Sequence, residues 1–157
     1  MIRFRDLTPG DMAVINAWPP YPPVFGELDY ALRSDGWLAE YLGKPDTWCF
    51  GVEELGELIA FTILSKTAED DAEFRIAVRA DKTDQGLGAP ITTMTLAKGF
   101  DEIGLRRIHL IVRKNHPRAI RLYARLGFKG KGECLKSVDG KQVHFLVMEL
   151  LKASYSP

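Results

Sequence analysis

Short stretches in which apolar and polar residues alternate recur through the first half of the chain. A period of two places every second side chain on one face of a strand. The pattern predicts four strands, over residues 2–7, 47–52, 58–65 and 74–78. Because the turn sequence Glu54-Leu55-Gly56-Glu57 lies between the second and third stretches, we expect these two strands to form a hairpin.

Two segments of the same half have helical spacing instead. Residues 11–18 follow Thr8-Pro9, a pair typical of a helix start, and residues 28–42 repeat apolar positions every three to four residues. The sequence between them, Trp18-Pro19-Pro20-Tyr21-Pro22-Pro23-Val24-Phe25, cannot be helical, because proline lacks an amide donor and restricts the residue before it. A stiff aromatic loop is therefore expected between two helices.

Helices and strands alternate in the second half. The pattern after Val78 predicts a glycine-containing loop, a helix over 91–103, a strand over 107–112, a helix over 118–126, and strands over 128–136 and 142–150. The last two strands are joined by an Asp139-Gly140 pair, a strong hairpin signal. Together with the first half this gives about seven strands and about four helices. We expect a mixed α/β fold, in which helices cover both faces of a twisted mixed sheet.

Composition supports one globular domain over residues 1–157. The chain is 46% hydrophobic and 27% charged, which suits a domain with a sizeable core. No apolar run approaches membrane-spanning length and the first residues lack the apolar core of a signal peptide, so a soluble cytoplasmic protein without a membrane partner is expected. Cys49 and Cys134 lie in strand-like segments without metal-binding spacing, so neither a disulfide framework nor a metal site is indicated.

The formal net charge of zero conceals a strong asymmetry. Residues 1–80 carry 7 Lys and Arg against 14 Asp and Glu, whereas residues 81–157 carry 14 against 7. The two halves should therefore prefer oppositely charged ligands. Residues 103–132 contain nine basic side chains and no acidic one, which indicates either a polyanion site or a solvated helix face.

A glycine-containing turn precedes the helix predicted at residue 91. It reads Asp84-Gln85-Gly86-Leu87-Gly88-Ala89-Pro90, so backbone amides without side-chain cover lie at a helix N-terminus. Anions bind at such positions, because the first amides of a helix have no partner within it. The sequence predicts a phosphate-binding loop here.

A second motif follows the strand over residues 107–112. Asn115-His116-Pro117 leads into the basic helix Arg118-Ala119-Ile120-Arg121-Leu122-Tyr123-Ala124-Arg125, which ends before Gly127-Phe128. A tyrosine one turn before this glycine could be directed at a molecule held by the first loop. The alternative is that Tyr123 only packs at helical spacing with Ile120 and Ala124.

These two motifs resemble those of the GNAT superfamily of acetyl-CoA-dependent N-acetyltransferases. The family pattern Arg/Gln-x-x-Gly-x-Gly/Ala corresponds to Thr83-Asp84-Gln85-Gly86-Leu87-Gly88, and its later Asn-x-x-Ala-x-x-x-Tyr-x-x-x-Gly-Phe to the segment from His116 to Phe128. Two residues depart from it. Thr83 stands where Arg or Gln is usual, and His116 stands in the asparagine position with Asn115 one residue before it.

The resemblance implies the cofactor acetyl-CoA and a division of the chain into an acceptor side, residues 1–80, and a cofactor side, residues 81–157. The backbone of Ile76, Ala77 and Val78 would pair with the pantetheine arm, and the loop would bind the pyrophosphate. The residues that the resemblance places at the cofactor are Ile76, Ala77, Val78, Thr83, Asp84, Gln85, Gly86, Leu87, Gly88, Ala89, Asn115, His116, Arg118, Ala119 and Arg121.

Acetyl transfer to an amine needs a base for the amine and an acid for the departing thiolate. The resemblance places the acid at Tyr123. It places the base at Glu73, although Glu73 belongs to the acidic run Glu69-Asp70-Asp71-Ala72-Glu73, which could equally be a solvated turn. A water relay could replace Glu73 as the base.

The acceptor side is rich in aromatic and acidic residues, which suits a primary amine of a small molecule or peptide. The proposed contacts are Trp18, Tyr21, Phe25, Tyr30 and Trp37; core packing is an alternative for each. A homodimer is possible. Two other functions remain open, a catalytically silent acyl-CoA-binding module on the same fold and nucleic-acid binding through Arg118, Arg121 and Arg125; the latter lacks accompanying stacking aromatics, so no nucleic-acid partner is expected.

Overall fold

A single seven-stranded sheet runs through the molecule. The computed structural model describes residues 1–22, 31–33, 36–138 and 140–156. Its elements are β1 (Ile2–Asp6), α1 (Asp11–Asn16), α2 (Trp37–Tyr41), β2 (Thr47–Glu54), β3 (Glu57–Ala68), β4 (Asp71–Val78), η2 (Ala80–Lys82), α3 (Gly88–Ala97), η3 (Lys98–Ile103), β5 (Arg107–Arg113), α4 (Pro117–Arg125), β6 (Lys129–Val138), β7 (Lys141–Leu151) and η4 (Lys152–Ser154).

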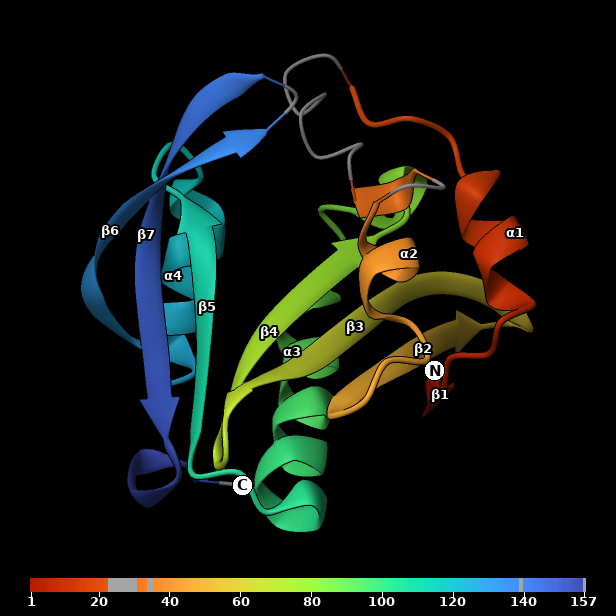
Figure 1. Ribbon diagram of the computed structural model, residues 1–157. Helices are drawn as coiled ribbons and strands as arrows, with labels where there is room; N and C mark the ends of the chain where they lie inside the picture. Colours follow the sequence, from red (N-terminus) through yellow and green to blue (C-terminus); the bar gives the residue numbers. More distant parts are fainter. Residues whose placement is uncertain (23–30, 34–35, 139, 157) are drawn as a thin grey trace.

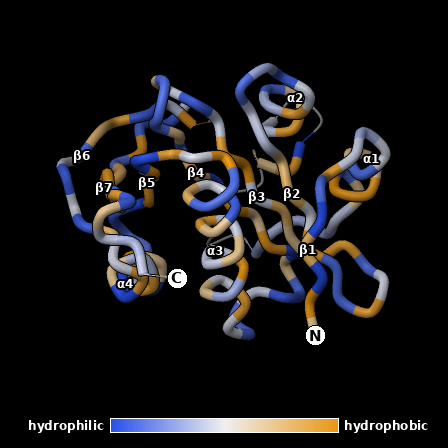
Figure 2. Tube along the Cα trace, turned by 90° about the horizontal axis from the view of Figure 1, so that it is seen from below, coloured by the Kyte–Doolittle hydropathy of each residue, from blue (hydrophilic) through white to orange (hydrophobic). Residues whose placement is uncertain are grey.

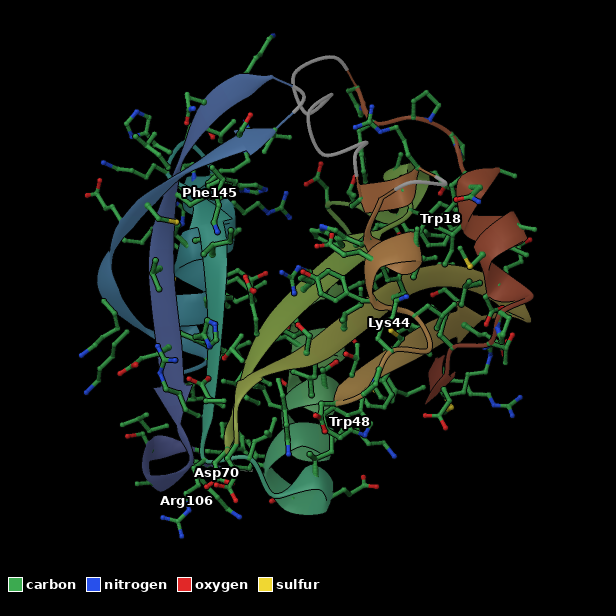
Figure 3. All side chains as sticks on the ribbon, in the orientation of Figure 1. Trp18, Lys44, Trp48, Asp70, Arg106 and Phe145 are labelled. Carbon is green, nitrogen blue, oxygen red and sulfur yellow. The ribbon has the colours of Figure 1, made fainter. Side chains whose placement is uncertain are left out.

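The strand order in the sheet is β1-β2-β3-β4-β5-β7-β6, and every neighbouring pair is antiparallel except β4 and β5. This parallel pair is short. It joins Asp71, Ala72 and Glu73 of β4 to the first three residues of β5, after which the two strands diverge (Figure 1). At the closed end the amides of Arg106 and Arg107 both donate to the Asp70 carbonyl, at 2.8 and 3.1 Å. Figure 3 shows Asp70 and Arg106 side by side there.

Helices cover both faces of the sheet, as the sequence predicts. Figure 2 shows α1 and α2 on one side, and α3 and α4 on the other. Alternation along β3 supplies both cores: Phe61 and Ile63 pack on the α1 and α2 side, whereas Leu64 packs on the α3 and α4 side. Because β3 has neighbours on both edges and helices on both faces, its residues from Leu58 to Ser65 are all buried.

The predicted order of strands and helices is confirmed, and the β2–β3 turn is a tight one. Leu55 and Gly56 both have positive φ, 53° and 81°, as expected for a hairpin loop that follows the right-handed twist of its strands. The helix predicted at 91–103 begins earlier, at Gly88, and continues to Ile103 with its last six residues in π-helical geometry.

The helix predicted over residues 28–42 is wrong in extent, since only Trp37–Tyr41 forms an α-helix among its described residues. Gly36 has φ −92° and ψ −142°, which is not helical and marks the start of α2. Residues 28–30 and 34–35 lie outside the described residues. Likewise α1 ends at Asn16 rather than residue 18. In the described part of the chain, no helix is both long and apolar enough to cross a membrane.

Candidate functional site

The divergence of β4 and β5 opens a cavity of about 490 Å³ in the middle of the sheet. Its walls come from six elements, α2, β4, β5, α4, β6 and β7. They include Trp37 and Tyr41 of α2, Glu73, Arg75 and Ile76 of β4, Ile111 and Arg113 of β5, His116, Ala119 and Tyr123 at α4, and Phe145 of β7. Figure 3 shows Phe145 on the β7 side of this gap. Side chains from both faces of β4 line it.

Tyr123 lies at the α4 wall of this cavity and is almost fully buried, with 7% of its surface exposed. Its ring packs edge-on against Phe74 and Phe128, with ring centroids 6.3 and 5.7 Å apart. Burial raises the pKa of the Tyr123 hydroxyl above its ordinary value, so the group stays protonated at neutral pH. The ring thus packs in the core and the residue borders the cavity, while its role as the acid stays a prediction.

The glycine-containing loop has the backbone geometry of an anion site. Asp84 and Gly86 have positive φ, 65° and 73°, and the position of a Cβ on Gly86 is open space. The amides of residues 86–89 donate to no acceptor within the described part of the chain. These amides precede and begin α3, and amides in such a position are the kind of donors that can bind an anion.

The side chains of Thr83 and Gln85 are hydrogen-bonded to the preceding turn η2. The Thr83 hydroxyl donates to the Ala80 carbonyl at 2.9 Å, and the Gln85 side-chain amide donates to the Asp81 carbonyl at 3.1 Å. Thr83 therefore shapes the turn in this structure. The hydrogen-bond donors that the loop leaves for a ligand are therefore backbone amides.

The start of α4 lies next to this loop. Arg118 forms an exposed ion pair with Asp84, which places the first turn of α4 beside the loop, and Arg121 is exposed on the same helix. His116 accepts a hydrogen bond at Nδ1 from the Ala119 amide, 3.3 Å away, and so caps the helix. Burial and the neighbouring Arg113 charge lower the pKa of His116, which keeps its ring neutral and able to accept. Asn115 is exposed, whereas His116 borders the cavity.

The free edge of β4 presents backbone groups to the cavity. Arg79 donates from its amide to Ile59 on β3, so by alternation the backbone of Ala77 also faces β3, whereas the backbones of Ile76 and Val78 face the β5 side. Beyond Glu73 that side is not paired with β5. The Val78 carbonyl accepts from the Tyr21 hydroxyl at 2.7 Å. Of the three residues predicted to pair with a cofactor arm, the structure thus turns Ile76 and Val78, but not Ala77, toward the opening.

Glu73 borders the cavity but is already ion-paired. Its Oε1 atom lies 2.8 Å from an Arg75 guanidinium nitrogen, and both side chains are largely buried. The rest of the acidic run behaves differently. Asp71 accepts from His109 at 2.8 Å and pairs with Arg107 at the closed end of the parallel pair, while Glu69 and Asp70 form the β3–β4 turn.

The predicted acceptor aromatics separate into three groups. Trp37 lines the cavity. Trp18 does not: it is 9% exposed and packs in the α1 and α2 core with Phe61, because the short helix α1 turns it toward the sheet (Figure 3). Tyr21 lies at the edge of that core and is not part of the cavity lining. Phe25 and Tyr30 lie outside the described residues.

The sequence analysis missed many of the lining residues, among them Tyr41, Arg75 and Phe145. Tyr41 lies one helical turn after Trp37, and Arg75 lies two residues after Glu73 on the same face of β4, so both spacings carried a usable signal. Phe145 carried none, because only the pairing of β7 with β5 brings it to the cavity wall.

A sheet opened between two parallel strands, beside a glycine-containing helix start and a buried tyrosine, is the arrangement implied by the two acetyltransferase-like motifs. Comparison with known proteins supports this class. Residues 12–128 match the family model described as "Acetyltransferase (GNAT) family". The chain therefore belongs to the GNAT acetyltransferase family.

Several spermidine acetyltransferases are similar to this chain. The spermidine N(1)-acetyltransferase of Escherichia coli is 33% identical over 86 residues, which are 54% of this chain and 46% of the relative, so the match spans about half the length of that protein. A chimera of spermidine N-acetyltransferase SpeG from Vibrio cholerae and hSSAT has a TM-score of 0.82 at 22% identity, over 98% of this chain and 97% of the other.

A second solved structure is the Vibrio cholerae spermidine N-acetyltransferase in complex with CoA and spermine. It has a TM-score of 0.77 at 22% identity, over 98% of this chain and 97% of the other. At this identity the likeness shows a shared fold. The predicted fold class and superfamily are thereby confirmed.

Proposed function

We propose that this chain is an acetyl-CoA-dependent N-acetyltransferase that moves the acetyl group to a primary amine of a small molecule by direct attack in a ternary complex. The observation that carries this proposal is the cavity between β4 and β5. It brings a buried, protonated tyrosine to a free strand edge, and α4, which carries that tyrosine, begins beside the amide loop of α3. Family membership supports the same reaction.

The residues around the cavity fit coenzyme A. The amides of residues 86–89 would bind the pyrophosphate, and the edge of β4 at Ile76 would hydrogen-bond the pantetheine amides as an added strand. Arg118 and Arg121 are exposed beside the loop and would meet the outer phosphates. Bound there, the cofactor supplies a thioester whose carbonyl accepts the amine.

Tyr123 is assigned as the acid. As the C–S bond breaks, its hydroxyl donates a hydrogen bond and then a proton to the thiolate sulfur. The attacking amine must be neutral, so it first loses a proton to Glu73 or to a water next to it. The Glu73 carboxylate borders the cavity, 2.8 Å from an Arg75 nitrogen, and from there could accept this proton.

The similar spermidine acetyltransferases support a small amine as the acceptor. One of the similar structures is described as a dodecamer of the Vibrio cholerae enzyme. For this chain, the homodimer and the cytoplasmic location stay predictions.

Three measurements test the proposed function. Calorimetry with coenzyme A should show binding at micromolar to millimolar concentration, and release of free thiol from acetyl-CoA should depend on added amine. Binding without amine-dependent thiol release across a panel of primary amines would instead indicate an acyl-CoA-binding module. Glu73→Gln should lower amine-dependent release, with Glu69→Gln in the exposed β3–β4 turn as its matched control; equal rates would assign the base to a water relay.

A further inference from the structure

Arg75 projects from β4 into a box of aromatic and polar groups on the α2 side of the cavity. Its guanidinium carbon lies 4.2 Å from the centroid of the Tyr41 ring and 6.0 Å from that of Trp37. One terminal nitrogen donates to Glu73 at 2.8 Å and the other to the Ser65 hydroxyl at 3.0 Å. A carboxylate and two ring faces are the groups with which proteins bind organic cations, and here a cation of the chain itself occupies them.

The charged side chains of the box are largely shielded from water. The Arg75 side chain is 15% exposed and the Glu73 side chain 17%. Burial raises the pKa of Tyr41 to about 12, so its ring stays neutral and keeps the electron-rich face that attracts the guanidinium. Displacing Arg75 would leave two charges without their partners in a largely buried place, which is costly.

A fixed guanidinium in the cavity wall determines which amines fit. Guanidinium has five N–H donors, and the two hydrogen bonds to Glu73 and Ser65 leave others for a ligand. Two further cations, Arg113 and Lys136, and one further carboxylate, Glu40, also border the cavity, so cations outnumber carboxylates in its wall. A polyamine would bring further ammonium groups toward these like charges, whereas a carboxylate next to the reacting amine would be attracted to them.

We propose that Arg75 is a specificity-determining residue that directs the cavity toward amines bearing a carboxylate, such as amino acids, and away from polyamines. The inference rests on the proposed function. The adjacent charges of Glu73 and Arg75 are complementary to a zwitterion: the ammonium group lies toward Glu73, where it can lose its proton, and the carboxylate accepts hydrogen bonds from Arg75. This acceptor class differs from the one named for the similar spermidine acetyltransferases.

Equilibrium binding tests this proposal without relying on turnover. Calorimetry is performed on the protein saturated with coenzyme A, using amino acids and the amines that lack only their carboxylate: phenylalanine with phenethylamine, tyrosine with tyramine, and leucine with isopentylamine. Spermidine is the polyamine arm. We expect at least one amino acid to bind about tenfold more tightly than its amine, and spermidine to bind more weakly than that amino acid. Equal affinities within all three pairs, no binding of any amino acid at millimolar concentration, or tighter binding of spermidine would overturn the proposal.

Substitutions at Arg75 then identify the residue responsible. Arg75→Met keeps an unbranched stem and removes the guanidinium with its charge; it should abolish the preference for the carboxylate and strengthen spermidine binding, whereas Arg75→Lys should keep part of the preference. The matched control is Lys66→Met, which removes a cation held 5.8 Å over Trp48 on the same sheet but outside the cavity lining. An unchanged preference in Arg75→Met would exclude the assigned role.

The two proposals fail in distinguishable ways. Thiol release with spermidine but not with amino acids would support acetyl transfer and refute the role of Arg75. Amino-acid binding that depends on Arg75, without thiol release from acetyl-CoA, would support the role of Arg75 in ligand choice and refute acetyl transfer. If Arg75→Met does not fold, the comparison of ligand pairs on the unaltered protein still decides the acceptor class.

Discussion

Replacing Tyr123 by phenylalanine removes one hydroxyl and leaves the packing of the ring intact. The ring contacts with Phe74 and Phe128 do not involve the hydroxyl, and no hydrogen bond joins this hydroxyl to any described residue. The substitution should therefore change the free energy of unfolding by less than about 1 kcal/mol. A loss of activity in this variant cannot be attributed to a loss of folded protein.

The size of the expected effect follows from the pKa of the group. Burial raises the pKa of Tyr123 above its ordinary value of 10.0, whereas a thiol ordinarily has a pKa of about 8.5. Proton transfer to the thiolate is thus uphill, so the transition state is stabilised mainly by the hydrogen bond that the hydroxyl donates to the developing charge, before the proton itself moves. Such a bond contributes about 1.5–3 kcal/mol, so kcat should fall about 10- to 100-fold.

The assay is thiol release from acetyl-CoA at saturating amine, with coenzyme A affinity measured separately by calorimetry. Affinity should change by less than about threefold, because the hydroxyl acts on the leaving sulfur rather than on the bound ground state. Tyr155→Phe is the matched control, since its hydroxyl lies 3.3 Å from Asp101 at an exposed place outside the cavity lining. Equal kcat for Tyr123→Phe and the unaltered protein would remove Tyr123 from the mechanism. In the unaltered protein, ionisation of Tyr123 should have no effect on kcat at any pH below about 10.

Two predictions concern stability. Asp11 accepts hydrogen bonds from both terminal Arg5 nitrogens, at 2.8 and 3.0 Å, and the bond to Arg5 is the main cause of its lowered pKa. Its stabilisation is present above the unfolded pKa of about 3.9 and is lost as pH falls through the lower folded value. In urea titrations at pH 7, Asp11→Asn should therefore lower the free energy of unfolding by about 2 kcal/mol. An equally large difference in the free energy of unfolding at pH 2 would contradict this. Gly99→Ala would place a Cβ 2.8 Å from the Ile108 side chain in the core and should lower the free energy of unfolding by about 1–3 kcal/mol. The control Gly10→Ala has a helical backbone and no atom closer than 3.8 Å to the new Cβ, so its Tm should be nearly unchanged.

Local patterns predicted most of the elements and the two motifs at residues 84–90 and 115–128. Residues 84–90 and 115–128 are each continuous in sequence, and the backbone geometry of a turn and a helix start depends on neighbouring residues. The adjacency of the two motifs is also seen in the structure, where Asp84 pairs with Arg118. The role of each predicted site residue stays a prediction.

Longer-range placement could not be obtained in the same way. The helical spacing of residues 28–42 predicted a long helix, but Gly36 is not helical, so α2 is confined to Trp37–Tyr41. Trp18 is aromatic and close to a proline-rich loop, features that core and binding-site residues share. Which of the two it becomes depends on the direction in which α1 faces the sheet.

The sequence by itself determined the order of the seven strands along the chain, the amide loop at residues 84–90 and the charge asymmetry between the two halves, because each of these is a property of neighbouring residues. Only the tertiary structure decided that β4 and β5 part after three pairs, and that α2 lies over β4 at that point. The cavity, and the box in which Arg75 meets Glu73, Trp37 and Tyr41, result from those two packing choices. They depend on the register of strands and the docking of a helix, which no periodicity along a single segment can specify.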